Sequence, residues 1–138
     1  MREILFRGKH TRTGEWVEGL LWKKKYNHNK LFISCFPDKD DNEEIYIIKP
    51  ETVGQYTGLT DKNGTKIFEG DIVRVEYTGV NKGLNGIAEV IFDKCKFALV
   101  WGWHKEIVCL TDFCNVEFEV VGNIHDNPEL LESEVEGE

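Results

Sequence analysis

Tryptophan and lysine residues gather in one stretch of the chain and form its clearest candidate binding motif. Trp16 and Trp22 are six residues apart, so both side chains point to the same face of an extended strand. Lys23, Lys24 and Lys25 follow directly. Aromatic rings beside cations can bind single-stranded nucleic acid by stacking and phosphate contacts. Because tryptophan is also enriched at protein interfaces, the stretch predicts a surface for either class of partner.

A second aromatic pair, Trp101 and Trp103, lies two residues apart and shares strand parity with Phe97 and Leu99. Arg74 is a further candidate cation, because it lies on an outward position of an alternating strand. The alternative interpretation is that most of these rings fill the hydrophobic core. The full set of candidate binding residues is Trp16, Trp22, Lys23, Lys24, Lys25, Arg74, Trp101 and Trp103.

The cysteines Cys35, Cys95, Cys109 and Cys114, together with His104, could in principle bind zinc or provide a nucleophile. None of the cysteines forms a C-x-x-C pair, which is the usual spacing of zinc and thioredoxin-like sites. Cys109 and Cys114 share strand parity with apolar neighbours, and a free cysteine often acts as a small core hydrophobe. We therefore expect buried, reduced thiols, no metal site and no cofactor.

Two carboxylates, Glu69 and Asp71, are spaced so that they could share a face and perform acid–base or metal chemistry. Gly70 between them indicates a turn instead, in which Asp71 bonds to nearby backbone amides. The acidic loop over residues 38–44 lacks the glycine and terminal glutamate of an EF-hand loop, so we interpret it as solvated charge. The sequence thus offers no catalytic residue, and we expect no enzyme.

Short strands must position these residues, because apolar and polar side chains alternate through most of the chain. Turns are expected at Tyr26–Asn29 and Asp61–Gly64, which are rich in turn-forming residues. A short helix is expected after Asn127 and Pro128, which suit the cap and first helical position. The expected strands are Glu3–Arg7, Glu15–Lys23, Lys30–Phe36, Glu44–Ile48, Thr52–Thr57, Ile72–Tyr77, Ile87–Asp93, Phe97–Trp103, Glu106–Thr111 and Asn115–Val121.

These elements predict an all-β fold that packs as one globular protein. Residues 1–49 form an N-terminal β-meander, residues 50–125 an SH3-like small barrel, and residues 126–138 a short helix with an acidic tail. The barrel assignment rests on the segment GDIVRV, in which a glycine allows a sharp bend and alternating valines enter a core.

Charge is distributed unevenly along the 138 residues, whose formal net charge is −8. Residues 126–138 contain six acidic residues and no Lys or Arg, whereas residues 1–30 contain eight basic and three acidic residues. No apolar run reaches the roughly 18 residues of a membrane span, and the N-terminus lacks a signal-peptide core. We expect a cytoplasmic protein without a membrane partner.

Several segments match a known family in order along the chain. These are REILFRGK and GEWVEG near the N-terminus, ETVGQYTGLTDKNGTKIFEGDIVRV in the middle and VEFEVVGNIHDNPELL near the C-terminus. With them the chain resembles the YopX family, small proteins encoded largely by bacteriophages and prophages. The resemblance implies an all-β protein with an SH3-like barrel in the cytoplasm of a phage-carrying bacterium. It brings no catalytic residues and no established biochemical function.

The leading hypothesis is a non-enzymatic phage accessory protein that binds a host or phage protein or assembles with itself. Sheet edges in small β proteins favour pairing, so a homo-oligomer is expected as one form of that binding. The alternative is nucleic-acid binding through the basic and aromatic surface around Trp22, which the overall acidity disfavours. An enzyme ranks third and would require Glu69, Asp71 or His104 to converge in a pocket.

Overall fold

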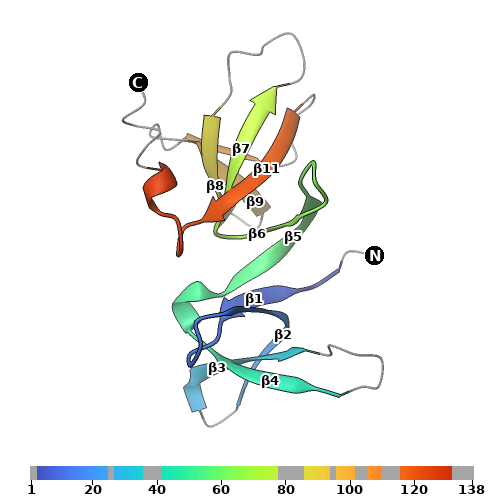
Figure 1. The fold of residues 1–138 in the computed structure, drawn as a ribbon, viewed down its shortest axis with the longest axis vertical. Coiled ribbons are helices and arrows are strands. Elements are labelled where there is room, and N and C mark those ends of the chain that lie inside the picture. The colour runs from blue at the N-terminus through green and yellow to red at the C-terminus, as the bar shows by residue number, and fades with distance from the viewer. Residues whose placement is uncertain are drawn as a thin grey trace. The chain divides into compact units, whose positions relative to one another are not determined.

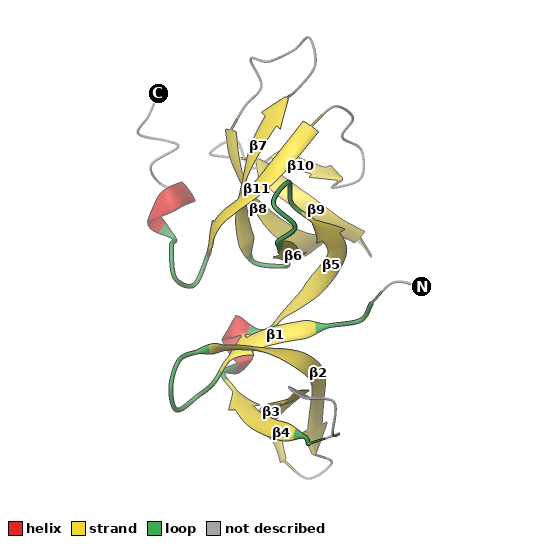
Figure 2. Ribbon diagram, turned by 45° about the vertical axis from the view of Figure 1, so that its right-hand side comes forward, coloured by secondary structure: helices red, strands yellow, loops and turns green. Residues whose placement is uncertain are grey.

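The fold of this chain, given by a computed structural model, is built mostly from antiparallel strands (Figures 1 and 2). The structure describes residues 3–24, 27–35, 42–77, 86–93, 96–101, 106–109 and 116–131. The strands are β1 (Phe6–Lys9), β2 (Trp16–Lys24), β3 (Asn27–Cys35), β4 (Glu44–Ile48), β5 (Gly54–Thr60), β6 (Lys66–Phe68), β7 (Asp71–Tyr77), β8 (Gly86–Asp93), β9 (Lys96–Trp101), β10 (Glu106–Cys109) and β11 (Val116–Asn123). A 3-10 helix, η1 (Pro50–Thr52), precedes β5, and residues 129–131 form one helical turn. The prediction of a mostly β fold is confirmed.

Two compact units make up the chain, Met1–Gly58 and Leu59–Glu138. One sheet has the strand order β4-β3-β2-β1-β5-β6 and the other has the order β10-β9-β8-β7-β11. β5 belongs to both units, because the division falls inside it. The sequence analysis placed the boundary between the N-terminal β-meander and the barrel earlier in the chain, near Lys49 and Pro50, where η1 begins.

The first sheet curls until the end of β4 bonds to the end of β1. The Thr11 N–H donates to the Ile47 carbonyl at 2.9 Å, and the Lys49 N–H donates to the Lys9 carbonyl at 2.9 Å. These two bonds flank a bridge between His10 and Ile48 that the strand pattern did not predict.

Glycine permits this tight curl at two inward positions. A Cβ added to Gly8 would lie 2.2 Å from Ile48 Cγ2, and one added to Gly19 would lie 2.1 Å from the Ser34 carbonyl oxygen. Ile33 and Ile48 are fully buried on this inner face. The sheet therefore closes on a small core that larger residues at the glycine positions would obstruct.

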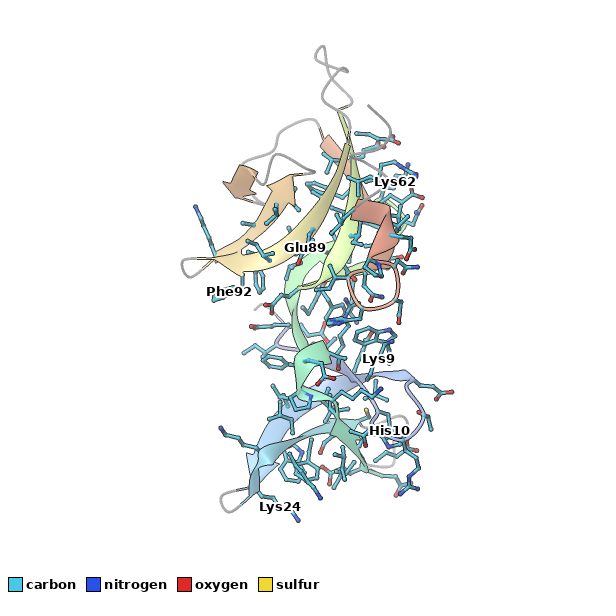
Figure 3. All side chains as sticks on the ribbon, turned by 90° about the vertical axis from the view of Figure 1, so that its left-hand side faces the viewer. Lys9, His10, Lys24, Lys62, Glu89 and Phe92 are labelled. Atoms are coloured by element: carbon cyan, nitrogen blue, oxygen red, sulfur yellow. The ribbon has the colours of Figure 1, made fainter. Side chains whose placement is uncertain are left out.

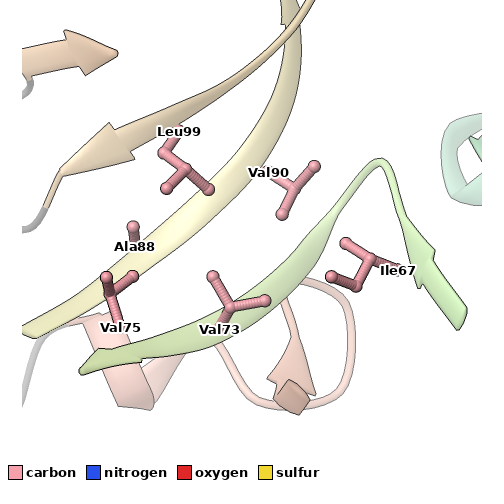
Figure 4. Close-up of a cluster of buried hydrophobic side chains, with 6 residues drawn as sticks. All are labelled: Ile67, Val73, Val75, Ala88, Val90 and Leu99. Carbon is pink, nitrogen blue, oxygen red and sulfur yellow. The ribbon is translucent and has the colours of Figure 1, made fainter. Parts of the chain in front are cut away.

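The second sheet has its own core, which follows the alternation seen in the sequence (Figure 4). Its fully buried members are Ile67, Val73, Val75, Ala88, Val90 and Leu99. Phe97, Phe118 and Val120 pack against them. Phe92 departs from this alternation, because it is exposed at the end of β8 (Figure 3). Its ring contacts that of Phe97 edge-on, with ring centroids 5.2 Å apart.

The predicted closed barrel is not formed by the described strand pairs, since β10 and β11 are the two edges of the second sheet. Closure needs a pair between such edges. The edge of β11 is instead occupied by the turn after β5. There the Lys62 N–H donates to the Phe118 carbonyl at 2.9 Å, and Asp61 Oδ2 accepts from the Val120 N–H at 2.9 Å.

Two turns were predicted correctly and one was wrong. Asp61–Gly64 is a turn, with Gly64 at φ 83°. Gly70 has φ 93°, and Asp71 Oδ2 accepts from the Phe68 N–H at 2.7 Å, as expected for the bend before β7. Residues 27–29 belong to β3 rather than to a turn, because Lys24 pairs with Asn27 and only residues 25 and 26 separate the two strands.

Candidate binding face of the first sheet

The candidate binding residues of β2 lie on both sides of that strand. Alternation places Trp16, Trp22 and Lys24 on the side facing away from Ile33 and Ile48, which we call the outer face. Lys23 has the opposite parity and is exposed. The outer face also receives side chains from β1, β3 and β4 through the strand registers. Its members are Arg7, Lys9, Trp16, Glu18, Leu20, Trp22, Lys24, Phe32, Ser34, Ile45 and Ile47.

Trp16 is bracketed by two cations of the neighbouring strand. The guanidinium carbon of Arg7 lies 4.6 Å from the ring centroid, and Lys9 Nζ lies 5.4 Å from it (Lys9 is labelled in Figure 3). Lys9 is directly opposite Trp16 in the register, which fixes this pairing. The Arg7 Nε and Nη2 atoms are shielded from solvent. Cation–π contacts of this geometry hold both the ring and the cations in place.

Trp22 is fixed by one stacking contact and one hydrogen bond. Its ring stacks on Phe32 with centroids 4.5 Å apart and an interplanar angle of 16°. Its Nε1–H donates to Ser34 Oγ at 2.8 Å, so the indole donor is satisfied in the sheet. Lys24 Nζ lies 5.7 Å from the Phe32 ring centroid. These contacts leave Trp22 half-buried and rigid.

A strip of exposed apolar side chains lies next to this aromatic pair. Leu20 is 54% exposed, Ile45 is 52% exposed and Ile47 is 37% exposed. Strand pairing arranges the outer-face side chains of β2, β3 and β4 in two rows. Leu20, Ser34 and Ile45 form one row. Trp22, Phe32 and Ile47 form the other. Half of the exposed large hydrophobic residues that the structure describes thus share one face.

The remaining candidates lie in the second unit or outside the described residues. Arg74 lies on β7 in the second unit, where its Nη1 is 3.0 Å from Glu119 Oε1. Trp101 lies on β9, where its backbone pairs with Ala88 and Glu106. Lys25 and Trp103 lie outside the described residues, as do Cys95, His104 and Cys114. The predictions for these residues remain predictions.

The sequence missed most of the outer face because its members come from four strands. Arg7, Lys9, Phe32, Ile45 and Ile47 were not proposed as binding residues. Alternation within each strand places these side chains on one face of that strand. The sequence does not show how neighbouring strands pair, and a register shift by one residue would move these side chains to the opposite face of the sheet.

Two buried carboxylates accept hydrogen bonds from backbone N–H groups. Asp71 bonds to the Phe68 N–H, as described above. Asp61 Oδ1 accepts from the N–H groups of Asn63 and Thr65, both at 2.9 Å, in addition to the bond from Val120 to Oδ2. Burial raises the pKa of Asp61, but these three donors and the charge of Lys62 outweigh it, so its pKa lies below the ordinary value. Asp61 is therefore a charged structural residue.

Cys35, the cysteine whose side chain the structure describes, is a weak nucleophile. Burial, followed by the nearby Glu44 carboxylate, raises the pKa of its thiol. The Sγ–H donates to the Glu18 carbonyl at 2.9 Å. A protonated thiol held in this way reacts slowly, because the thiolate is the reactive form. In the part of the chain that the structure covers, no group of three His, Cys, Asp or Glu side chains could hold a metal ion.

Comparison with known proteins decides the family. The profile described as YopX protein matches residues 5–132. The chain belongs to the YopX family. The comparison with curated proteins gives no match.

Two solved structures resemble this YopX-family chain over nearly its whole length. Protein EF1440 from Enterococcus faecalis is 26% identical, with a TM-score of 0.56, over 95% of this chain and 99% of that one. Protein yopX from Bacillus subtilis is 15% identical, with a TM-score of 0.59, over 94% of this chain and 98% of that one. The second likeness shows a shared fold.

Proposed function

We propose that this YopX-family protein is a non-enzymatic accessory protein of a phage or prophage. It binds another protein, or a second copy of itself, in the bacterial cytoplasm. The outer face of the first sheet is the binding surface. The observation that carries this proposal is the shared exposure of Leu20, Ile45 and Ile47 beside the rigid Trp22–Phe32 pair. Clustered apolar side chains flanked by polar residues are typical of protein interaction sites.

A non-catalytic role is supported by what the acidic groups already do. Asp61 and Asp71 are buried and accept hydrogen bonds from backbone N–H groups. A general acid or base needs a carboxyl group that can reach a substrate. The protonated Cys35 thiol favours the same conclusion.

We also propose that the second unit is SH3-like although its described sheet is open. Four strands, β7 to β10, form a meander, and β11 returns to pair with β7. That connectivity is the one found in SH3-like folds, many of which bind other proteins. Fold alone does not assign a function, so the proposal depends on the outer face.

The test is capture of interacting protein with purified, tagged chain, followed by light scattering. Leu20→Lys places a charge in the middle of the outer face and should remove most of the captured protein. Phe92→Lys is the matched control, because Phe92 is similarly exposed but lies in the second unit. Equal capture by wild type and both variants would show that the outer face is not the binding surface. A monomer that captures nothing would contradict the proposed function.

Nucleic-acid binding is the second candidate, favoured by the cation–aromatic contacts around Trp16 and Phe32. It predicts affinity for single-stranded oligonucleotides that weakens steeply with salt. Fluorescence titration at two salt concentrations separates the candidates. If Lys9→Ala and Lys24→Ala weaken oligonucleotide binding while Leu20→Lys does not, the second candidate replaces the first.

A further inference from the structure

β4 is an edge strand that is only half covered. It ends the order β4-β3-β2-β1-β5-β6 of the first sheet. Its second half is covered, because the Ile47 carbonyl accepts from Thr11 and the Lys49 N–H donates to Lys9. An uncovered edge presents free N–H and C=O groups that can pair with another strand.

The direction of the Ile47 carbonyl shows which groups of the first half are open. Backbone groups of successive residues point to alternate sides of a strand, so those of Ile45 and Ile47 point away from β3 together. Apart from the Ile47 carbonyl, no described residue bonds to these outward groups. The open groups of the first half are therefore the Ile45 N–H and the Ile45 carbonyl.

Within β4 only Glu44 is charged, so the side chains of this edge hinder pairing little. Proteins usually block open edges with Lys, Pro or a covering loop, whereas β4 has the sequence EIYII. The edge of β11 illustrates the usual device in this same chain, since the turn at Asp61 and Lys62 covers its outward groups. β4 combines an open edge with two exposed isoleucines on the outer face.

We infer that β4 pairs antiparallel with β4 of a second copy, about a two-fold axis at Ile45. The Ile45 N–H then donates to the carbonyl of Ile45 of the partner subunit, and the reverse bond forms by symmetry. This inference rests on the self-assembly form of the proposed function and names its contact.

Charge selects this orientation and this occupant. Glu43 and Glu44 lie at the start of β4 and Lys49 lies just after its end. An antiparallel pair brings the acidic start of one strand toward the basic end of the other, whereas a parallel pair would align like charges. The exposed Ile45 side chains meet at the axis, and the apolar strips of the two copies become continuous.

Sedimentation equilibrium of the full chain over a micromolar concentration series tests the inference. Ile45→Pro removes an outward N–H without removing a bond to β3, and proline is tolerated at sheet edges. It should weaken dimerisation by at least about tenfold, because two symmetric hydrogen bonds are lost. Ile45→Lys should do the same by placing like charges at the axis, and it keeps the test valid if the proline variant fails to fold by circular dichroism.

Phe92→Lys is the control, because Phe92 is similarly exposed but lies on β8 in the second unit. The inference expects a wild-type dimer that Phe92→Lys preserves and both Ile45 variants disrupt. A dimer lost only in Leu20→Lys would overturn edge pairing while supporting the outer face as a binding surface. A wild-type monomer, or a dimer that survives both Ile45 variants, would overturn the inference and leave capture of a different protein to decide the proposed function.

Discussion

Single residues tie together segments of the second unit that are far apart in the sequence. Asp61 shows this best, because one carboxylate accepts hydrogen bonds from its own turn and from β11, 59 residues further along the chain. The sequence identified Asp61 as part of a turn but could not show the bond to Val120. Local turn chemistry is readable from residue type, whereas the partner across the fold depends on tertiary structure.

Asp61→Asn should lower the free energy of unfolding at pH 7 by about 1–3 kcal/mol, because it removes a charged acceptor from partly buried N–H donors. Urea denaturation measures the loss, and Glu51→Gln at an exposed position is the control. The pKa of Asp61 is lowered by folding, so its contribution is present above the ordinary pKa and is lost as the pH falls through the folded value. The difference between wild type and Asp61→Asn should therefore close in acid; a constant difference would contradict this role.

At the scale of elements, alternation located nearly every strand and even the bounds of Glu44–Ile48. It failed where pairing overrides residue preference. Asn27 and its two neighbours have turn-forming character, yet the pairing of Asn27 with Lys24 draws them into β3. Register, curl and closure could not be predicted, because they depend on which strands meet. The outer face could not be predicted for the same reason, although Trp16 and Trp22 correctly indicated which side chains of β2 share a face.

The curl of the first sheet gives an element-scale prediction. Gly19→Ala would place a Cβ 2.1 Å from the Ser34 carbonyl oxygen, a backbone atom that cannot move without disturbing the β2–β3 pair. We expect a loss of about 1–3 kcal/mol in the free energy of unfolding, measured by urea denaturation.

Gly14→Ala is the comparison for this prediction. A Cβ there has open space, so only the strain of its φ of 75° remains. A Gly19→Ala variant as stable as wild type would show that the close approach of β2 and β3 is not required.

At the scale of the whole molecule, charge and apolar surface are divided between the two units. Residues 1–58 carry ten basic and nine acidic residues, whereas residues 59–138 carry seven basic and sixteen acidic residues. The outer face lies in the unit that is nearly neutral, so a protein partner meets little repulsion there. The acidic second unit disfavours close approach of a nucleic acid, which supports the protein-binding proposal over its alternative.

The outer face can be tested directly by photo-crosslinking in bacterial cells that produce the full chain. A benzophenone amino acid in place of Leu20 should give a discrete protein adduct, either with another protein or with a second copy. The same probe in place of Glu51, an exposed residue of η1, should give none. Equal adducts from both positions, no adduct from Leu20, or an adduct with nucleic acid alone would contradict the assignment of the outer face as a protein-binding surface.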